Sequence, residues 1–209
     1  MMTKRSILAW GGAAAAATAY AFVLRPWHLR WGATDEEVAK RLPGDEVASG
    51  RALDTTRAIT IHAPIAQVWP WLVQIGQGRG GFYSYTWLEN LVGCRMKNAD
   101  RVHPELQSLE PGAPIYLHPK APPLRVTHLE PGRALVLGTS WAFVLKPIDE
   151  RTTRLLVRGR GRFENPDLGT VLNFLYWRLV FEPAHFVMER KMMLGIKARA
   201  ERASRSLPS

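Results

Sequence analysis

Apolar residues between positions 64 and 93 recur three and four positions apart on both sides of a glycine-rich turn. Before the turn they are Val68, Trp71, Leu72 and Ile75, and after it they are Tyr85, Leu88, Leu91 and Val92. This spacing predicts two short helices joined by a glycine elbow. Pro64 suits the first turn of the first helix, and Gly93 ends the second. Pro70 should kink the first helix or make it restart.

A period of two residues marks the flanking segments. Residues 57–62 alternate in this way and predict a first strand. Five later segments, separated by turns rich in proline, glycine and polar residues, share the pattern; they are 113–117, 124–129, 134–139, 141–148 and 153–163. This order predicts an antiparallel meander. Residues 168–202 return to helical spacing, and Pro183 should bend that helix.

Arginines alternate with apolar residues and glycines in the last predicted strand. Arg154, Arg158, Arg160 and Arg162 share one face, and Leu155, Val157, Gly159, Gly161 and Phe163 share the other. We predict that the arginine face is outer and solvated, either as a plain charged stripe or as a surface for lipid headgroups. The inner face is hollow at Gly159 and Gly161, which predicts either a closely packed helix or a cavity.

The predicted C-terminal helix carries an apolar stripe. Met188, Met192 and Ile196 are four residues apart and should face the sheet, with basic residues on the opposite side. The stripe is typical of core packing. Because methionine side chains are adaptable, it could equally form part of the wall of a cavity for an apolar ligand.

Residues 6–24 form an uncharged run, SILAWGGAAAAATAYAFVL, with basic residues on both sides. At about 1.5 Å per residue the run approaches the ~30 Å hydrocarbon core of a bilayer. It predicts a single-pass membrane anchor within residues 1–31. A cleaved signal peptide, with Ala17-Thr18-Ala19 as its cleavage motif, is the alternative. The basic residues that follow the run favour a cytoplasmic globular domain.

The rest of the chain divides by composition. Residues 32–54 have mixed charge and predict a linker with a short helix at 35–42, capped by Thr34. Residues 55–203 form the predicted globular domain, and residues 204–209 a disordered tail. The net charge of +10 suits an anionic membrane surface. Because no zinc-finger or RNP-like motif accompanies it, nucleic acid is not predicted as a partner.

Three segments carry a resemblance to a known family. They are AITIHAPIAQVWPWLVQIGQGRGGFYSYTWLENLVG at 58–93, SWAFVLKPI at 140–148 and FEPAHFVMERKMMLGIKARAE at 181–201. Together with the order of predicted elements, they resemble the SRPBCC superfamily, which includes START-like lipid carriers and polyketide cyclase/dehydratase proteins. The resemblance covers about residues 55–202. It implies an α+β helix-grip fold with an apolar cavity between an antiparallel sheet and a long C-terminal helix.

No motif identifies a cofactor or a metal site. Gly76, Gly78 and Gly81 spell G-x-G-x-x-G, but a predicted helix rather than a strand precedes them, so the motif does not predict nucleotide binding. Glu182-x-x-His185 has the spacing of a di-iron ligand pair, but the required second copy is absent. Cys94, the single cysteine, has no identifiable catalytic partner. No catalytic residue is assigned.

Two functions remain open. One is a membrane-tethered module that binds a hydrophobic small molecule or lipid, and the other is a cyclase/dehydratase-type enzyme. The lack of a compact polar motif favours the first. Candidate residues for the cavity wall or for a gate at the elbow of residues 76–87 are Trp71, Gly78, Phe82, Tyr83, Tyr85, Trp87, Glu89, Gly159, Gly161, His185, Met188 and Met192. Tyr83, Tyr85, Glu89 and His185 are the ones that could take part in chemistry.

Overall fold

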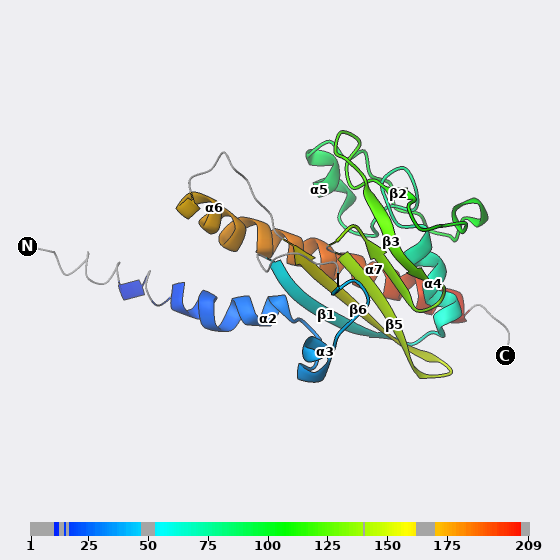
Figure 1. The fold of residues 1–209 in the computed structure, drawn as a ribbon, viewed down its shortest axis with the longest axis horizontal. Coiled ribbons are helices and arrows are strands. Elements are labelled where there is room, and N and C mark those ends of the chain that lie inside the picture. Colours follow the sequence, from blue (N-terminus) through cyan, green and yellow to red (C-terminus); the bar gives the residue numbers. More distant parts are fainter. Residues whose placement is uncertain are drawn as a thin grey trace, which may run out of the picture.

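A computed structural model describes residues 11–12, 15, 17–46, 53–139, 141–161 and 170–205. Its centre is a six-stranded sheet in the order β1-β6-β5-β4-β3-β2, in which all neighbouring strands are antiparallel (Figure 1). The strands are β1 Leu53–Ile61, β2 Pro114–Ile115, β3 Leu124–Glu130, β4 Ala134–Leu137, β5 Trp141–Asp149 and β6 Thr152–Gly161. The predicted antiparallel meander is therefore confirmed.

Several strand boundaries differ from the pattern by one or two residues, and β2 is Pro114–Ile115 instead of 113–117. Two differences have a physical reason in the structure. β1 begins four residues earlier than predicted because residues 53–56 pair with the end of β6. β4 ends at Leu137 because Gly138, with a φ of 59°, turns the chain into the next hairpin. Residues 162 and 163 of the last predicted strand lie outside the described residues.

The two helices after β1 are α4 Ile65–Val73 and α5 Thr86–Leu91. Gly93, with a φ of 86°, follows α5 as predicted. Of the two outcomes expected at Pro70, a kink or a restart, the restart does not occur, since α4 continues through this residue. Pro70 forfeits only the bond to the carbonyl of Ala66, and Ala66 is exposed to solvent, which can replace that bond.

The C-terminal helix consists of α6 Thr170–Tyr176, η3 Trp177–Phe181 and α7 Glu182–Arg205. The middle part is a π-helical turn, in which the N–H of Glu182 donates to the carbonyl of Trp177. It lies directly before Pro183, whose missing N–H removes one α-helical bond. The bend predicted at Pro183 stays a prediction; the structure has a π-helical turn on the N-terminal side of this residue.

One face of the sheet packs against α7 and α4. The core on this face includes Leu155 and Val157 of β6, Leu72 of α4, and Met192 and Ile196 of α7. The apolar stripe of the C-terminal helix therefore faces the sheet as predicted. Three further short helices, η1 Tyr20–Leu24, α2 Arg25–Leu29 and α3 Asp35–Ala39, precede the sheet, and η2 Pro104–Leu106 lies between α5 and β2.

The opposite face of the sheet is covered by residues 32–46, so the prediction of a solvated arginine face is wrong. Thr34 caps α3 as predicted. The residues after α3 then lie on the sheet, where Leu42 packs with Ala58, Val144 and Leu156. This segment is a packed layer, and not the free linker that its mixed charge suggested.

Arg158 explains why this layer is held. It is only 2% exposed. Its guanidinium donates to the carbonyls of Glu37, Val38 and Lys40 and forms an ion pair of 2.6 Å with Asp45. Arg154 binds both carboxylate oxygens of Glu37 at 2.8 Å. Two of the predicted surface arginines thus fasten the N-terminal layer to β6.

The uncharged run at residues 6–24 falls partly outside the described residues, since 6–10, 13, 14 and 16 are not described. Its described part is helical and continues into α2, which runs beside the start of α7 (Figure 1). Within the described ranges, no helix has both the length and the apolar character needed to cross a bilayer.

Candidate functional site

A cavity of about 310 Å³ lies between the sheet, α5 and the C-terminal helix. Its wall is mostly apolar and aromatic, and its polar groups are those of Ser84, Glu89, Cys94, His185 and Glu189. The lining residues are Phe82, Ser84, Glu89, Cys94, Met96, Leu117, Leu124, Trp141, Gly159, Phe181, His185, Met188, Glu189 and Met192. An apolar pocket with a few converging polar groups is the usual form of a small-molecule site.

Trp141, the first residue of β5, forms the aromatic side of the cavity. The ring of Trp141 lies 4.8 Å from that of Phe143 and 5.9 Å from that of Phe82, measured between ring centres. Gly159 of β6 is the register partner of Trp141 and lacks a side chain, so it leaves space beside the indole. The strand alternation thus places a large flat wall next to a gap.

Glu189 of α7 is fixed at one end of the cavity. One carboxylate oxygen accepts from the indole N–H of Trp141 at 2.9 Å, and the other accepts from Arg57. Arg57 is completely buried and also donates through Nε to the carbonyl of His28 at 2.8 Å. Paired charges with further hydrogen bonds tolerate burial, so this cluster is a fixed polar boundary of an otherwise apolar site.

His185 lies one helical turn before Glu189. Its Nδ1 is 3.1 Å from a guanidinium nitrogen of Arg57, which can only donate, so Nδ1 accepts and Nε2 carries the proton. Burial lowers the pKa of His185; Arg57 lowers it further and Glu189 opposes this. Nε2 is 3.7 Å from the nearer oxygen of Glu189, beyond a hydrogen bond. A neutral His185 can therefore donate its Nε2 proton to a bound molecule.

Glu89 of α5 is the second carboxyl group in the wall. It is 8% exposed, and one of its carboxyl oxygens has no hydrogen-bond partner among the described residues. Burial raises its pKa above the ordinary value. A carboxyl group in such surroundings favours its protonated form, in which it can both donate and accept hydrogen bonds.

Two further polar groups in the wall are less suited to chemistry. Ser84 donates its hydroxyl proton to the carbonyl of Met188 at 2.8 Å. The pKa of the Cys94 thiol is raised by burial and by the nearby carboxyl group of Glu89. Because the thiolate is the nucleophilic form, this raised pKa makes Cys94 a poor nucleophile.

The structure brings half of the candidate residues together at the cavity: Phe82, Glu89, Gly159, His185, Met188 and Met192. Trp71 and Tyr83 lie instead in the core, where the Tyr83 hydroxyl donates to the carbonyl of Trp71 at 2.9 Å. Gly195 explains this position, because a Cβ there would lie 2.3 Å from the carbonyl oxygen of Tyr83. α7 approaches the elbow so closely that these two rings face inward, away from the cavity.

Three other candidates do not line the cavity. Gly78 and Trp87 are exposed, Trp87 by 68% of its surface. Tyr85 lies below the ammonium group of Lys191, which is 5.4 Å from the centre of its ring. Gly161, the remaining candidate, pairs with Leu53 at the end of β6, and its place in the cavity wall stays a prediction.

The elbow is hydrogen-bonded and mostly buried, which opposes its interpretation as a gate. Gly76 and Gly81 exchange two backbone hydrogen bonds of 3.1 and 3.0 Å. Gly80 donates to the carbonyl of Gln74 at 2.7 Å, and Gln77 donates to that of Tyr116 at 2.8 Å. These bonds favour the alternative in which the elbow completes the core.

Arg57, Trp141 and Glu189 were not among the candidates. Arg57 shares its strand parity with Ile59 and Ile61, so the alternation of β1 already placed it on the inner face. Glu189 lies three residues before Met192 and four after His185, on the same side of the helix. The sequence signal for this pair was an arginine and a glutamate at inward-facing positions of a strand and a helix.

In the described part of the chain no cluster of metal-ligating side chains occurs. Glu182, the first residue of the Glu-x-x-His pair, is buried and binds Arg25 through both of its oxygens, at 2.8 and 3.0 Å. This carboxylate is therefore neutralised by an arginine within the structure.

Comparison with known proteins adds little. No family model matches the chain, and no curated protein matches its sequence. Among solved structures, the chain is similar to the solution NMR structure of a polyketide cyclase-like protein from Corynebacterium glutamicum. The identity is 16%, the match covers 73% of this chain and 89% of the other, and the TM-score is 0.30.

The elements of this chain assign its fold. They are an antiparallel sheet, two short helices after the first strand and a long C-terminal helix across one face. This arrangement is the α+β helix-grip fold that the resemblance to the SRPBCC superfamily implied.

Proposed function

We propose that this protein binds a hydrophobic small molecule or lipid in the cavity between the sheet and the C-terminal helix. The single observation that carries the proposal is the composition of the cavity wall. Phe82, Trp141, Met188 and Met192 offer apolar and adaptable surface, while the polar groups gather at a few points. A volume of about 310 Å³ suits a ligand at the small end of those that proteins enclose.

The polar groups define the ligand further. The Nε2 proton of His185 calls for an acceptor, such as a carbonyl or hydroxyl oxygen. A protonated Glu89 can donate to a second oxygen. Glu189 is already satisfied by Trp141 and Arg57 and is not needed for binding. The proposed ligand is thus mainly apolar, with one or two oxygen functions and no strong charge.

Membrane tethering through residues 6–24, with the globular domain on the cytoplasmic side, remains part of this proposal. Its support is the uncharged run and the basic residues around it. Fractionation of cells that express the full chain tests it. Unprocessed protein that stays wholly soluble contradicts an anchor, and a mature N-terminus near Tyr20 establishes the signal peptide instead.

Native mass spectrometry of the detergent-extracted protein tests ligand binding. We expect a co-purified small molecule on the unmodified chain, and at least about a tenfold loss of it in Met188→Trp, whose indole fills the cavity. Val187→Trp is the matched control, because Val187 is the neighbouring residue and is 46% exposed. Gly159→Leu fills the cavity from the sheet side and should behave like Met188→Trp. Equal ligand retention in all variants that remain folded contradicts the proposal.

A cyclase/dehydratase-type enzyme is the second candidate function. It is favoured by one observation, the convergence of His185 and Glu89 on the same apolar cavity. A neutral histidine N–H could stabilise an enolate oxygen, and a carboxyl group could transfer a proton. Incubation of the captured molecule with fresh protein tests this candidate. Conversion that disappears in His185→Gln, while binding persists, supports the enzyme, whereas an unchanged molecule supports a carrier.

A further inference from the structure

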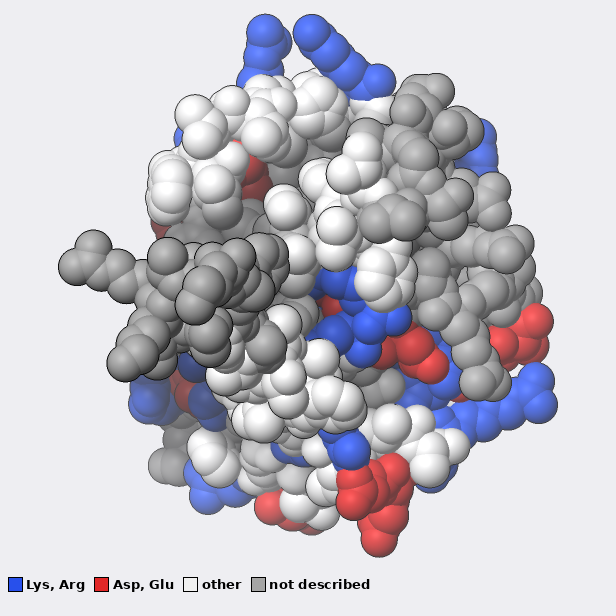
Figure 2. Space-filling model, turned by 90° about the vertical axis from the view of Figure 1, so that its left-hand side faces the viewer, with Lys and Arg blue, Asp and Glu red and all other residues white. Residues whose placement is uncertain are grey.

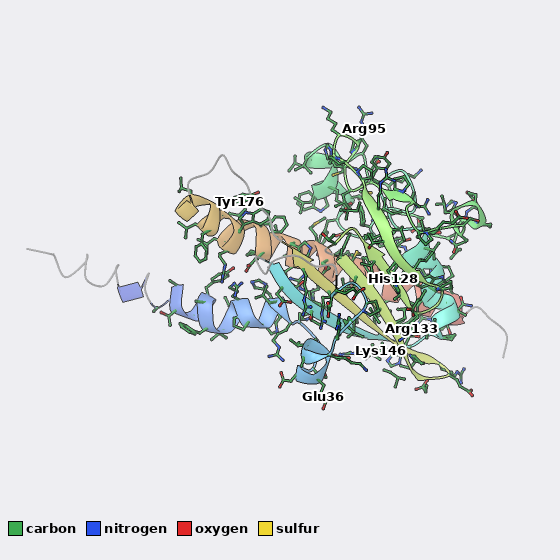
Figure 3. All side chains as sticks on the ribbon, viewed as in Figure 1. Glu36, Arg95, His128, Arg133, Lys146 and Tyr176 are labelled. Atoms are coloured by element: carbon green, nitrogen blue, oxygen red, sulfur yellow. The ribbon has the colours of Figure 1, made fainter. Side chains whose placement is uncertain are left out.

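The first part of the C-terminal helix, residues 170–181, extends beyond the sheet, and Tyr176 lies on this extension (Figures 1 and 3). Six of its apolar side chains are at least 43% exposed: Leu172, Phe174, Leu175, Tyr176, Leu179 and Val180. At about 3.6 residues per turn they occupy roughly two thirds of the helix circumference. A helix that is apolar over so much of its surface is normally covered by protein or by lipid.

The N-terminal helix runs beside this extension. The Tyr20 hydroxyl donates to the carbonyl of Arg178, Arg25 binds Glu182, and the rings of Trp27 and Phe186 are 5.2 Å apart. The two hydrogen-bonded pairs are 158 and 157 residues apart, so the two helices run in the same direction. The N-terminal helix also exposes apolar side chains, namely Phe22, Val23, Leu24 and Trp27.

Charge divides this helix pair into two zones. Arg25 and Arg178 both contact Glu182 at one level. On the outer side of that level, residues 17–24 and 170–177 contain no charged side chain. Seen from the outer end, uncharged atoms dominate the described surface around a central group of basic and acidic atoms (Figure 2). Arginines at the end of an apolar segment are typical of the headgroup level of a bilayer.

The length of the extension indicates how deep it could enter a bilayer. Twelve residues at about 1.5 Å each measure ~18 Å, which matches one leaflet of a ~30 Å hydrocarbon core. The segment is therefore too short to cross a bilayer, in agreement with the lack of a spanning helix in the described part of the chain. It is long enough to place its aromatic residues among the acyl chains.

We propose that residues 170–181 insert into one leaflet of an anionic bilayer, beside residues 17–24, with the side chains of Arg25 and Arg178 extended to Glu182 at the headgroup level. The net charge of +10 favours such a surface. Phe181, at the end of the inserted segment, and His185 one turn later line the cavity. The cavity therefore adjoins the membrane surface. As far as the proposed function holds, a hydrophobic ligand passes between bilayer and cavity without crossing water.

Depth-dependent fluorescence quenching tests the insertion in the full chain. Cys94→Ala removes the native thiol, and Leu175→Cys or Leu179→Cys carries an NBD label. The matched control is Ile148→Cys, at a 57% exposed apolar position of the β5–β6 hairpin. After reconstitution into phosphatidylcholine–phosphatidylglycerol vesicles, lipids with acyl-chain nitroxides should quench labels at 175 and 179 about threefold or more above the control. Circular dichroism verifies that each labelled protein is folded.

Quenching at 175 and 179 that does not exceed the control overturns the proposal. If a label is shielded from water but not quenched, a second copy of the chain and not lipid covers residues 170–181. That result also overturns the proposal. Native mass spectrometry of Leu175→Asp is measured separately. Ligand retention without quenching at 175 and 179 overturns only the insertion, whereas quenching without any bound ligand in the unmodified chain overturns only the proposed function.

Discussion

Glu89 and Glu189 line the same cavity but have opposite surroundings. Both carboxylate oxygens of Glu189 accept hydrogen bonds, from Arg57 and Trp141. Glu89 has an oxygen without a hydrogen-bond partner among the described residues, and burial raises its pKa. Of the two carboxyl groups, Glu89 is therefore the one whose hydrogen-bonding capacity is left for a ligand.

Glu89→Gln should stabilise the protein mainly at alkaline pH. Because the folded-state pKa is raised above the ordinary 4.5, the stability contribution of Glu89 is complete below that value and is lost as pH rises through the raised pKa. Glutamine removes this loss. We expect the free energy of unfolding to rise by about 1 kcal/mol at about pH 8 and to change little at about pH 4.

Urea denaturation at both pH values measures this difference. The exposed Glu110 supplies the control, since Glu110→Gln should change the free energy of unfolding by less than about 0.5 kcal/mol at either pH. If Glu89→Gln raises the free energy of unfolding equally at acid and alkaline pH, the ionised carboxylate of Glu89 is not the destabilising form.

At the scale of elements, the elbow between α4 and α5 behaves as part of the core. Its glycines turn the chain, and their amides are bonded to backbone carbonyls. We expect slow hydrogen exchange at Gly76, Gly80 and Gly81, both in the empty protein and with ligand bound. The exposed residues Asp35 and Glu36, whose amides lie in the first turn of α3 and have no partner within the helix, should exchange quickly in both states. Fast exchange at the elbow that slows when ligand binds re-establishes it as a gate.

At the scale of the whole molecule, the sheet lies between two layers that come from opposite ends of the chain. The C-terminal helix covers one face and residues 32–46 cover the other. Arg158 connects the second layer to β6 through buried bonds to three carbonyls and to Asp45. The N-terminal segment is therefore part of the folded domain, and it fixes the position of the helix that precedes it.

Arg158→Leu should lower the free energy of unfolding by about 3–5 kcal/mol, because it leaves three buried carbonyls without their donor and removes one of the two arginines that pair with Asp45. Arg133→Leu is the control. Its side chain is 71% exposed and pairs only with Glu130, so the change should stay within about 0.5 kcal/mol. Thermal and urea unfolding measure both variants. A neutral Arg158→Leu means that residues 32–46 are a loose tether after all.

The sequence by itself determined the strands, the two central helices, the C-terminal helix and most of their boundaries. These follow from the period of apolar residues and from the positions of glycine and proline, which act over a few residues. The same alternation assigned Leu155 and Val157 to one face of β6 and the arginines to the other. It also placed six of the twelve candidate residues where they line the cavity.

Only the tertiary structure decided what covers each face. Arg158 meets Asp45 across 113 residues, and Arg57 meets Glu189 across 132. Local periodicity assigns a charged side chain to a face, as it does for Arg57, but it does not identify the distant residue that pairs with it there. The same limit applies to Trp71 and Tyr83, which face the core because α7 passes within contact distance at Gly195. Local physics determines the elements, and long-range packing determines which of their residues form the site.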